Sequence, residues 1–106
     1  MSIKQRISKT RGIISDLPQA FEDSSFVTGD SPATLDCKAA LGRNAIEGYI
    51  KNGGAGNFTV AFSQDGTTYS DEHTMENGEI LNFSERSYDS IRITWISDSS
   101  YKISVG

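Results

Sequence analysis

From residue 33 to the C-terminus, apolar and polar residues alternate in short runs, which turn-forming residues interrupt roughly every 8–12 residues. Residues 57–63 (NFTVAFS) show the pattern clearly, because Phe58, Val60 and Phe62 fall on one face and polar or small residues on the other. A period of two is the period of a half-buried β-strand, and no sustained 3.6-residue period follows residue 30. The pattern predicts an all-β domain over residues 31–106: an antiparallel β-sandwich of about seven strands with jelly-roll or immunoglobulin-like topology.

The same alternation assigns core residues along the predicted strands. We expect Trp95 and Phe62 near the centre of the core, with Tyr101, Ile103 and Val105 facing inward from the last strand. The polar run at residues 68–75 (TYSDEHTM) predicts an edge strand. Two further strands are predicted at residues 33–41 and 44–52, with inward-facing positions at Leu35, Cys37, Ala39, Leu41, Ile46, Gly48 and Ile50.

The first 30 residues lack this pattern and predict a partly extended N-terminal arm. Residues 1–15 contain four basic residues and no acidic one, whereas residues 16–106 contain the other six basic residues and all fourteen acidic ones. Residues 1–15 therefore carry a net charge of +4 and residues 16–106 a net charge of −8. Such asymmetry is typical of a chain with an interaction tail. The candidate partner-binding residues of the arm are Ile3, Lys4, Arg6, Ile7, Lys9, Arg11, Ile13 and Ile14.

The composition of the arm favours a protein partner over nucleic acid. Basic residues bind phosphates by releasing counterions, but four charges are few, and no aromatic residue interleaves them before Phe21. The acidic remainder would also repel phosphates. Isoleucines spaced among basic residues suit a segment that lies on another protein, including another copy of this chain. The alternative is a solvated tail that binds nothing.

The stretch FSQDGTTYS, residues 62–70, is either a binding loop or a turn. Asp-Gly between two alternating segments is a strong hairpin signal, because Gly66 adopts a positive φ freely and Asp65 can accept hydrogen bonds from its own backbone. The stretch resembles the S-x-D-G-x-x-[YW] hairpin of many viral and extracellular β-sandwiches, discoidin-like and other carbohydrate-binding domains among them. We therefore interpret it as a turn.

No pattern in the sequence indicates catalysis, a metal site or a cofactor. Cys37 is the only cysteine, which excludes an internal disulfide, and its alternation predicts a small buried side chain. The only histidine, His73, falls in a polar run and is expected to be solvated. The glycine-rich GGAG, residues 53–56, lacks the Lys and Ser/Thr of a phosphate loop, and the acids between residues 71 and 79 do not follow the spacing of a calcium loop. We expect a non-enzymatic protein without a cofactor.

A small β-sandwich with a charged N-terminal arm resembles the structural and accessory proteins of tailed-phage particles. That resemblance implies a capsid decoration, head-fibre or tail/adaptor component in the virion, assembled in the host cytoplasm and bound through its arm to other virion proteins or to copies of itself. The sequence shows neither a secretory signal nor an apolar run long enough to span a membrane, so we expect assembly in a cytoplasm. The alternative function is a carbohydrate-binding module that uses the acids near Asp65 and Asp71 together with aromatic residues, namely Tyr49, Tyr69, Tyr88, Tyr101 and Trp95.

Overall fold

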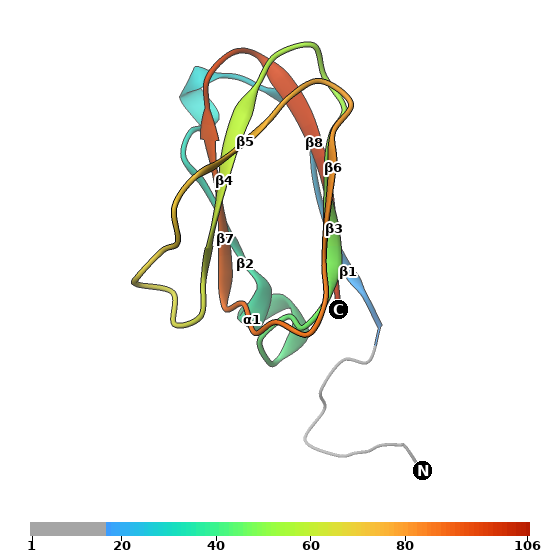
Figure 1. Cartoon of the computed structure of the whole chain (residues 1–106), viewed down its shortest axis with the longest axis vertical. Coiled ribbons are helices and arrows are strands. Elements are labelled where there is room, and N and C mark those ends of the chain that lie inside the picture. Colours follow the sequence, from blue (N-terminus) through green and yellow to red (C-terminus); the bar gives the residue numbers. More distant parts are fainter. Residues whose placement is uncertain (1–16) are drawn as a thin grey trace.

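The computed structural model describes residues 17–106 as two four-stranded antiparallel sheets packed face to face (Figure 1). The strand orders are β1-β8-β3-β6 and β2-β7-β4-β5, and every connection except β4–β5 crosses between the sheets, as in a jelly roll. The predicted sandwich is confirmed, with eight strands. The strands are β1 (Gln19–Phe26), β2 (Ala33–Asp36), β3 (Gly48–Asn52), β4 (Phe58–Ser63), β5 (His73–Met75), β6 (Ile80–Phe83), β7 (Ser90–Trp95) and β8 (Ser99–Val105).

The core lies between the two sheets and is aliphatic around an aromatic centre. Phe26, Phe58 and Tyr101 meet edge to face, with ring centroids 5.4–6.2 Å apart. Edge-to-face contacts of this kind add to the stabilisation that burial of the rings provides. The predicted inward positions of β8 are confirmed. The largest aliphatic side chains of the core are Ile50, Ile91, Ile93, Ile103, Leu41 and Met75.

The prediction that Trp95 and Phe62 lie at the core's centre was wrong. Both are half-buried and pack against the core from its margins. The indole Nε1 of Trp95 donates a hydrogen bond to a carboxylate oxygen of Asp98 at 2.9 Å, and this bond keeps the ring near the exposed turn that follows β7. The size of Trp95 predicts a central position, but its indole N–H needs a hydrogen-bond partner, and Asp98 provides one at the margin of the core.

The sandwich begins earlier than the boundary predicted between arm and domain. Strand β1 pairs with β8 from Gln19 opposite Val105 to Phe26 opposite Ser99. Phe26 is fully buried, so this strand contributes to the core. Residues 17–30 therefore belong to the folded domain. The eight candidate partner-binding residues of the predicted arm lie outside the described residues.

The predicted strand through Cys37 ends halfway and continues as a helix, α1 (Cys37–Leu41). The carboxylate of Asp36 accepts a hydrogen bond from the backbone N–H of Ala39 at 2.9 Å, which caps the helix, and Gly42 ends it with φ of 79°. Cys37 and Leu41 are both buried, whereas Ala39 is exposed. A spacing of four residues fits one face of a helix as well as one face of a strand, and this ambiguity caused the error.

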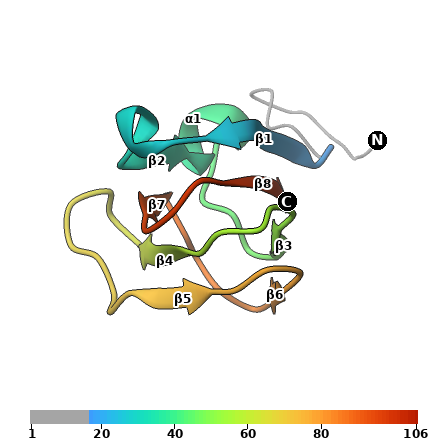
Figure 2. The ribbon, with the colours of Figure 1, turned by 90° about the horizontal axis from the view of Figure 1, so that it is seen from above.

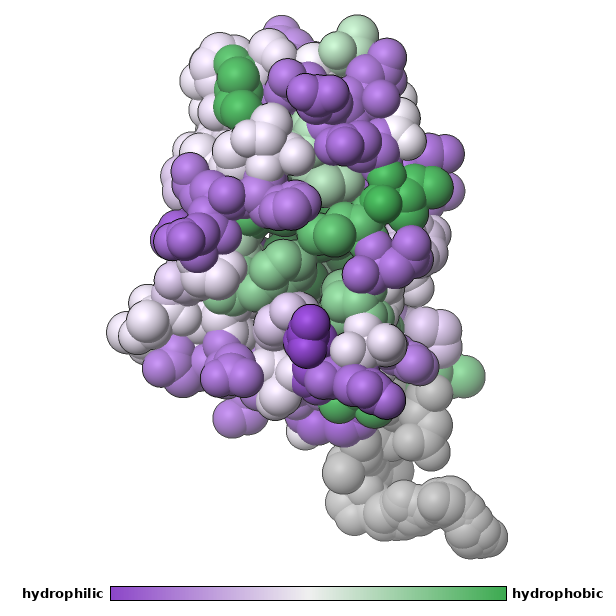
Figure 3. Space-filling view, viewed as in Figure 1, coloured by the Kyte–Doolittle hydropathy of each residue, from purple (hydrophilic) through white to green (hydrophobic). Residues whose placement is uncertain are grey.

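One side of the sandwich is left open. Strand β5 has three residues and pairs only with the first half of β4, so residues 64–72 form a loop beside the second half (Figure 2). The predicted polar edge strand is thus present but short. β5 and β6 are edge strands of different sheets on this same side, and apolar side chains form a band between them (Figure 3). We call this surface the open side. It includes Leu81, Phe83, Phe62 and Tyr88, and the exposed Ile80 of the edge strand β6 borders it.

Within the described part of the chain, the helices are short, and none has the length and hydropathy needed to cross a bilayer.

Candidate functional site

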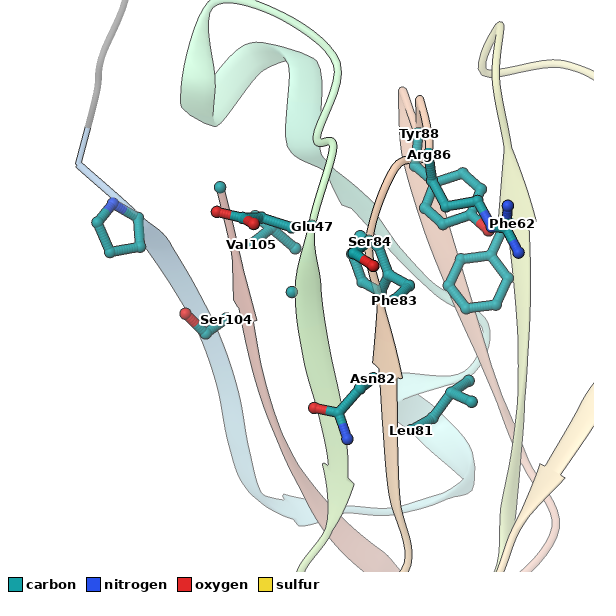
Figure 4. A pocket seen from close by; sticks show the side chains of 13 residues that line it. Glu47, Phe62, Leu81, Asn82, Phe83, Ser84, Arg86, Tyr88, Ser104 and Val105 are labelled. Carbon is teal, nitrogen blue, oxygen red and sulfur yellow. The ribbon is translucent and has the colours of Figure 1, made fainter.

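A groove of about 600 Å³ crosses the end of the sandwich near α1 and the C-terminus, which is the lower end in Figure 1, and Figure 4 shows its lining side chains. The groove runs across all four strands of the sheet β1-β8-β3-β6. Each strand or its adjoining loop contributes a lining residue: Pro18 (β1), Ser104 (β8), Glu47 (β3) and Asn82 (β6). It ends on the open side, at Phe62 and its aromatic neighbours. A volume of this size is within the range of ligand-binding clefts.

A cluster of three aromatic rings forms the far end of the groove. The rings of Phe62 and Tyr88 stack with centroids 4.5 Å apart, and Phe83 lies 6.0 Å from Phe62 and 5.0 Å from Tyr88. The three rings come from β4, from β6 and from the segment before β7, so the cluster connects the two sheets at the open side. All three are half-buried, which leaves part of each ring accessible to a ligand.

Gly48 of β3 makes room for this cluster. A Cβ atom at this position would collide with the backbone oxygen of Ser104 and would lie 3.0 Å from Cζ of Phe83. The ring of Phe83 therefore packs over a strand position where a side chain is missing. Phe83 takes its place in the groove because the opposite residue, Gly48, is glycine.

The loop that carries Arg86 and Tyr88 is fixed by backbone hydrogen bonds. Tyr88 and Ala45 exchange two hydrogen bonds of 2.8 Å, and the N–H of Arg86 donates to the oxygen of Ile46 at 3.1 Å. Glu85 adopts a φ of 56°, a conformation that non-glycine residues rarely adopt. This turn of the backbone brings the side chain of Arg86 to the groove beside Tyr88 (Figure 4).

Several polar side chains of the groove are available to a ligand. Among residues 17–106, no hydrogen bond or ion pair engages the side chains of Asn82, Arg86 or Glu47. They offer amide, guanidinium and carboxylate groups around an aromatic surface. The arrangement suits binding of a partner that has both apolar and polar groups.

A second hollow of about 620 Å³ adjoins the groove and shares Phe62, Arg86 and Tyr88 with it. It continues over the loop of residues 64–72, where Tyr69 lies with its ring 4.2 Å from the guanidinium carbon of Arg92. The two hollows together form one accessible surface along the open side.

The predicted turn at Asp65 is present beside this second hollow. One carboxylate oxygen of Asp65 accepts hydrogen bonds from the N–H groups of Thr68 and Thr67, at 2.9 and 2.8 Å, and from the hydroxyl of Ser63 at 3.0 Å. These donors, with the Thr68 N–H first, lower the pKa of Asp65 below its ordinary value. Gly66 has the expected positive φ, 82°. The carboxylate holds the turn together, as the turn interpretation requires.

The two residues considered for reactive chemistry lie apart from the groove. Cys37 is fully buried, and its burial, with smaller contributions from the carboxylates of Asp36 and Asp89, raises the pKa of the thiol to about 11. A thiol that stays protonated is a poor nucleophile. His73 is exposed on β5, as predicted. Within residues 17–106, no three His, Cys, Asp or Glu side chains are placed to hold a metal ion.

The aromatic residues proposed for sugar stacking are dispersed. Tyr101 is a core residue, Trp95 packs near the turn after β7, and Tyr69 and Tyr88 line the second hollow described above. The sequence did not single out Phe83 or Arg86, because the residues of the groove come from segments that are far apart in the chain. An arginine next to a predicted strand end gave no signal by itself.

Comparisons with known proteins leave the family open. No protein-family model matches the sequence, and no curated protein shows a significant match. Among solved structures, the chain is similar to a crystal structure of PirA, with 14% sequence identity and a TM-score of 0.43 over 84% of each chain. A likeness at this level assigns no function to the chain.

Proposed function

We propose that this chain is a non-enzymatic structural or accessory protein of a tailed-phage type of particle, such as a capsid decoration, head-fibre or tail/adaptor component. In this role it binds neighbouring subunits, either other virion proteins or copies of itself. The N-terminal segment provides the tether and the sandwich provides the body. The particle would be assembled in the host cytoplasm.

The observation that supports this proposal is the open side of the sandwich. Ile80 of the edge strand β6 is 56% exposed, and Leu81 and Phe83 of the same strand line the groove. Contiguous apolar surface with a polar rim is typical of interaction sites, and covering it with another protein would stabilise the assembly. Jelly rolls occur in capsid proteins and in lectins alike, so the fold is compatible with the proposal without deciding it.

A matched pair of isoleucine variants tests the proposal. Ile80→Asn changes the edge strand β6 that borders the open side, and Ile96→Asn changes an isoleucine of similar exposure, 45%, just beyond the end of β7. Both residues are exposed, so both variants should fold. We expect Ile80→Asn to lower the oligomeric mass in size-exclusion chromatography with light scattering, and Ile96→Asn to leave it unchanged. Equal behaviour of the two variants would argue against the open side as an interface.

A carbohydrate-binding module is the second candidate function. It is favoured by one observation: the uncommitted side chain of Arg86 lies beside the stacked rings of Phe62 and Tyr88 (Figure 4). Sugars bind through the combination of an aromatic face and polar hydrogen-bonding groups. Specific glycan-array binding that Arg86→Ala abolishes would favour this function. If no glycan on the array binds at high protein concentration, the carbohydrate-binding function is contradicted and the assembly role is favoured.

A further inference from the structure

Arg86 lies where the groove and the second hollow meet. It lines both of them, and its side chain lies beside Phe62 and Tyr88 (Figure 4). The side chain is exposed, and among residues 17–106 no hydrogen bond or ion pair engages it. In the described part of the chain, it is also the one basic lining residue of these two hollows. An anionic group that enters either hollow therefore meets a guanidinium whose donors are free.

The backbone around Arg86 is held in a single, strained conformation. The N–H of Arg86 donates to the backbone oxygen of Ile46 at 3.1 Å, and the side-chain amide of Asn44 donates to the hydroxyl of Ser87 at 3.0 Å. The preceding residue, Glu85, has the positive φ of 56°. Strain of this kind gathers at binding and active sites. The base of the Arg86 side chain is therefore preorganised, which lowers the entropy that a ligand loses on binding.

Uncharged hydrogen-bonding groups line the second hollow next to this guanidinium. They include the side-chain amide of Gln64 and the hydroxyls of Tyr69 and Tyr88. Within residues 17–106, no hydrogen bond engages these three groups. Groups that both donate and accept, placed beside aromatic rings, match the polar edge and the apolar face of a sugar ring. The hollow of about 620 Å³ is large enough to hold such a ring.

Two carboxylates restrict where an anionic group can bind. The carboxylate of Asp65 lines the second hollow and is held by the hydrogen bonds of its turn. Glu47 lines the groove, and in Figure 4 it lies on the other side of Phe83 from Arg86. Neither carboxylate forms an ion pair with Arg86. Because both repel an anion, the negative group of a ligand belongs at Arg86 and its uncharged groups belong toward Asp65.

The edge of β4 beside these hollows is closed to an extended peptide. Peptides often bind by adding a strand to an exposed sheet edge. Here the N–H of Ser70 donates to the backbone oxygen of Phe62 at 2.8 Å, and the N–H of Phe62 donates to the hydroxyl of Ser70 at 3.0 Å. The loop of residues 64–72 thus satisfies the backbone of this edge, and side chains alone remain for recognition. This favours a saccharide over an acidic peptide.

We propose that Arg86 binds the carboxylate of an acidic saccharide, whose ring lies in the second hollow beside Tyr69 and Tyr88. This assignment rests on the second candidate function, carbohydrate binding, and names its ligand class. A planar guanidinium can donate two parallel hydrogen bonds to a carboxylate, so it distinguishes a sugar acid from a neutral sugar of the same shape. The carboxylate can belong to a uronic acid within a polysaccharide or to a terminal sialic acid.

Calorimetric titration of the full-length protein with two matched pairs of ligands tests the proposal. The first pair is trigalacturonic acid and its methyl ester, and the second is sialyllactose and its methyl ester. Esterification removes the negative charge and keeps the sugar. We expect one of the acids to bind about 10-fold more tightly than its ester, because the ester loses the charge-assisted hydrogen bonds. The pair that shows this preference identifies the source of the carboxylate.

Variants of the full-length protein then locate the site. Arg86→Gln should reduce the affinity for the acid to that for its ester, and Arg86→Lys, which keeps the charge without the planar fork, should retain part of the preference. Lys102→Gln is the control, because it removes one positive charge from an exposed position of β8 outside both hollows. It should leave the preference unchanged. Circular dichroism checks the fold of each variant, and the comparison of acid with ester in the wild type requires no variant.

Four outcomes would overturn the proposal. They are equal affinities for acid and ester, a preference that Arg86→Gln retains, binding of none of the four saccharides at millimolar concentration, and equally tight binding of an acetylated triglutamate peptide. The last would assign the site to an acidic peptide. Equal and measurable binding of acid and ester refutes the role of Arg86 and keeps the carbohydrate-binding function. If no saccharide of either pair binds, the glycan array decides whether carbohydrate binding fails as well.

Discussion

The ring of Tyr88 lies stacked on the ring of Phe62, with centroids 4.5 Å apart and planes inclined by 22°. The two residues belong to β4 and to the segment before β7, and their contact forms the aromatic end of the groove. The shape of the candidate site therefore depends on how β4 and the segment before β7 pack in the sheet β2-β7-β4-β5.

The stack should appear as a coupling energy in a double-mutant cycle. We expect Phe62→Leu and Tyr88→Leu to be non-additive in urea unfolding by about 0.5–1.5 kcal/mol, because each substitution removes the same ring contact. Phe62→Leu combined with Trp95→Leu is the matched control, since these half-buried rings share no ring contact. Additive effects for Phe62 and Tyr88 would show that their contact contributes no stability.

Gly48→Ala should destabilise the protein and distort the groove. The new Cβ would collide with the backbone of Ser104 and crowd Phe83, which costs about 1–3 kcal/mol for overpacking of this kind. Gly29→Ala is the control, because a Cβ at Gly29 meets nothing within 4 Å, and its effect should stay within about 0.5 kcal/mol. Urea unfolding measures both, and equal effects would contradict the tight fit around Gly48.

Asp65 should stabilise the protein only where its carboxylate is ionised. Its pKa is lowered in the folded state, so the native turn favours the charged form, and the stabilisation is lost as the pH falls below the ordinary value of 3.8. We expect the melting temperature of Asp65→Asn to lie below that of the wild type at neutral pH, with the gap closing in acid. Asp71→Asn changes an exposed carboxylate outside the turn and should show no such gap. A gap for Asp65→Asn that does not depend on pH would contradict the charge-based role.

Cys37 should react with thiol reagents only when the protein opens. Its side chain is fully buried, and the raised pKa keeps the thiol protonated in the folded state. An exposed thiol introduced by Lys102→Cys provides the control and should react at once. Rapid labelling of Cys37 in the folded protein would contradict its place in the core.

The same thiol makes a pH prediction at the alkaline end. The unfolded thiol ionises near its ordinary value of 9.0, whereas the folded one ionises at about 11. Between these values the unfolded state gains stability, so the free energy of unfolding should fall with rising pH more steeply in the wild type than in Cys37→Ala. If the free energy of unfolding falls equally with pH in the wild type and in Cys37→Ala, the raised pKa of Cys37 in the folded protein is contradicted.

Much of the fold follows from local pattern alone. The period-two alternation correctly assigned the core residues of β8 and most of those of β4 and β7, because each of these strands has a face against the core, but Phe62 and Trp95 lie at its margin. It failed at Cys37 and Leu41, where four-residue spacing also fits a helix. The alternation did not predict β1. This strand is mostly polar, with Phe21 and Phe26 as its large apolar residues, and its partner, β8, lies at the other end of the chain.

The candidate site was less predictable for a physical reason. Its residues are contributed by β3, β4, β6, β8 and the loop before β7, and only the folded sandwich brings them together. Phe62 was assigned to the core by its alternation, although the short β5 leaves it beside open surface. The length of β5 depends on the turn at Asp65 and the loop after it, which no periodic pattern encodes.

The most direct test of the central claim is the molar mass of the full-length protein and of a variant that lacks residues 1–15, measured by size-exclusion chromatography with light scattering. Circular dichroism should show that the variant keeps its β-structure, since the eight strands begin at Gln19. We predict a multi-copy full-length protein and a variant of lower mass. An identical mass for the two proteins would contradict the claim that this segment holds neighbouring subunits together.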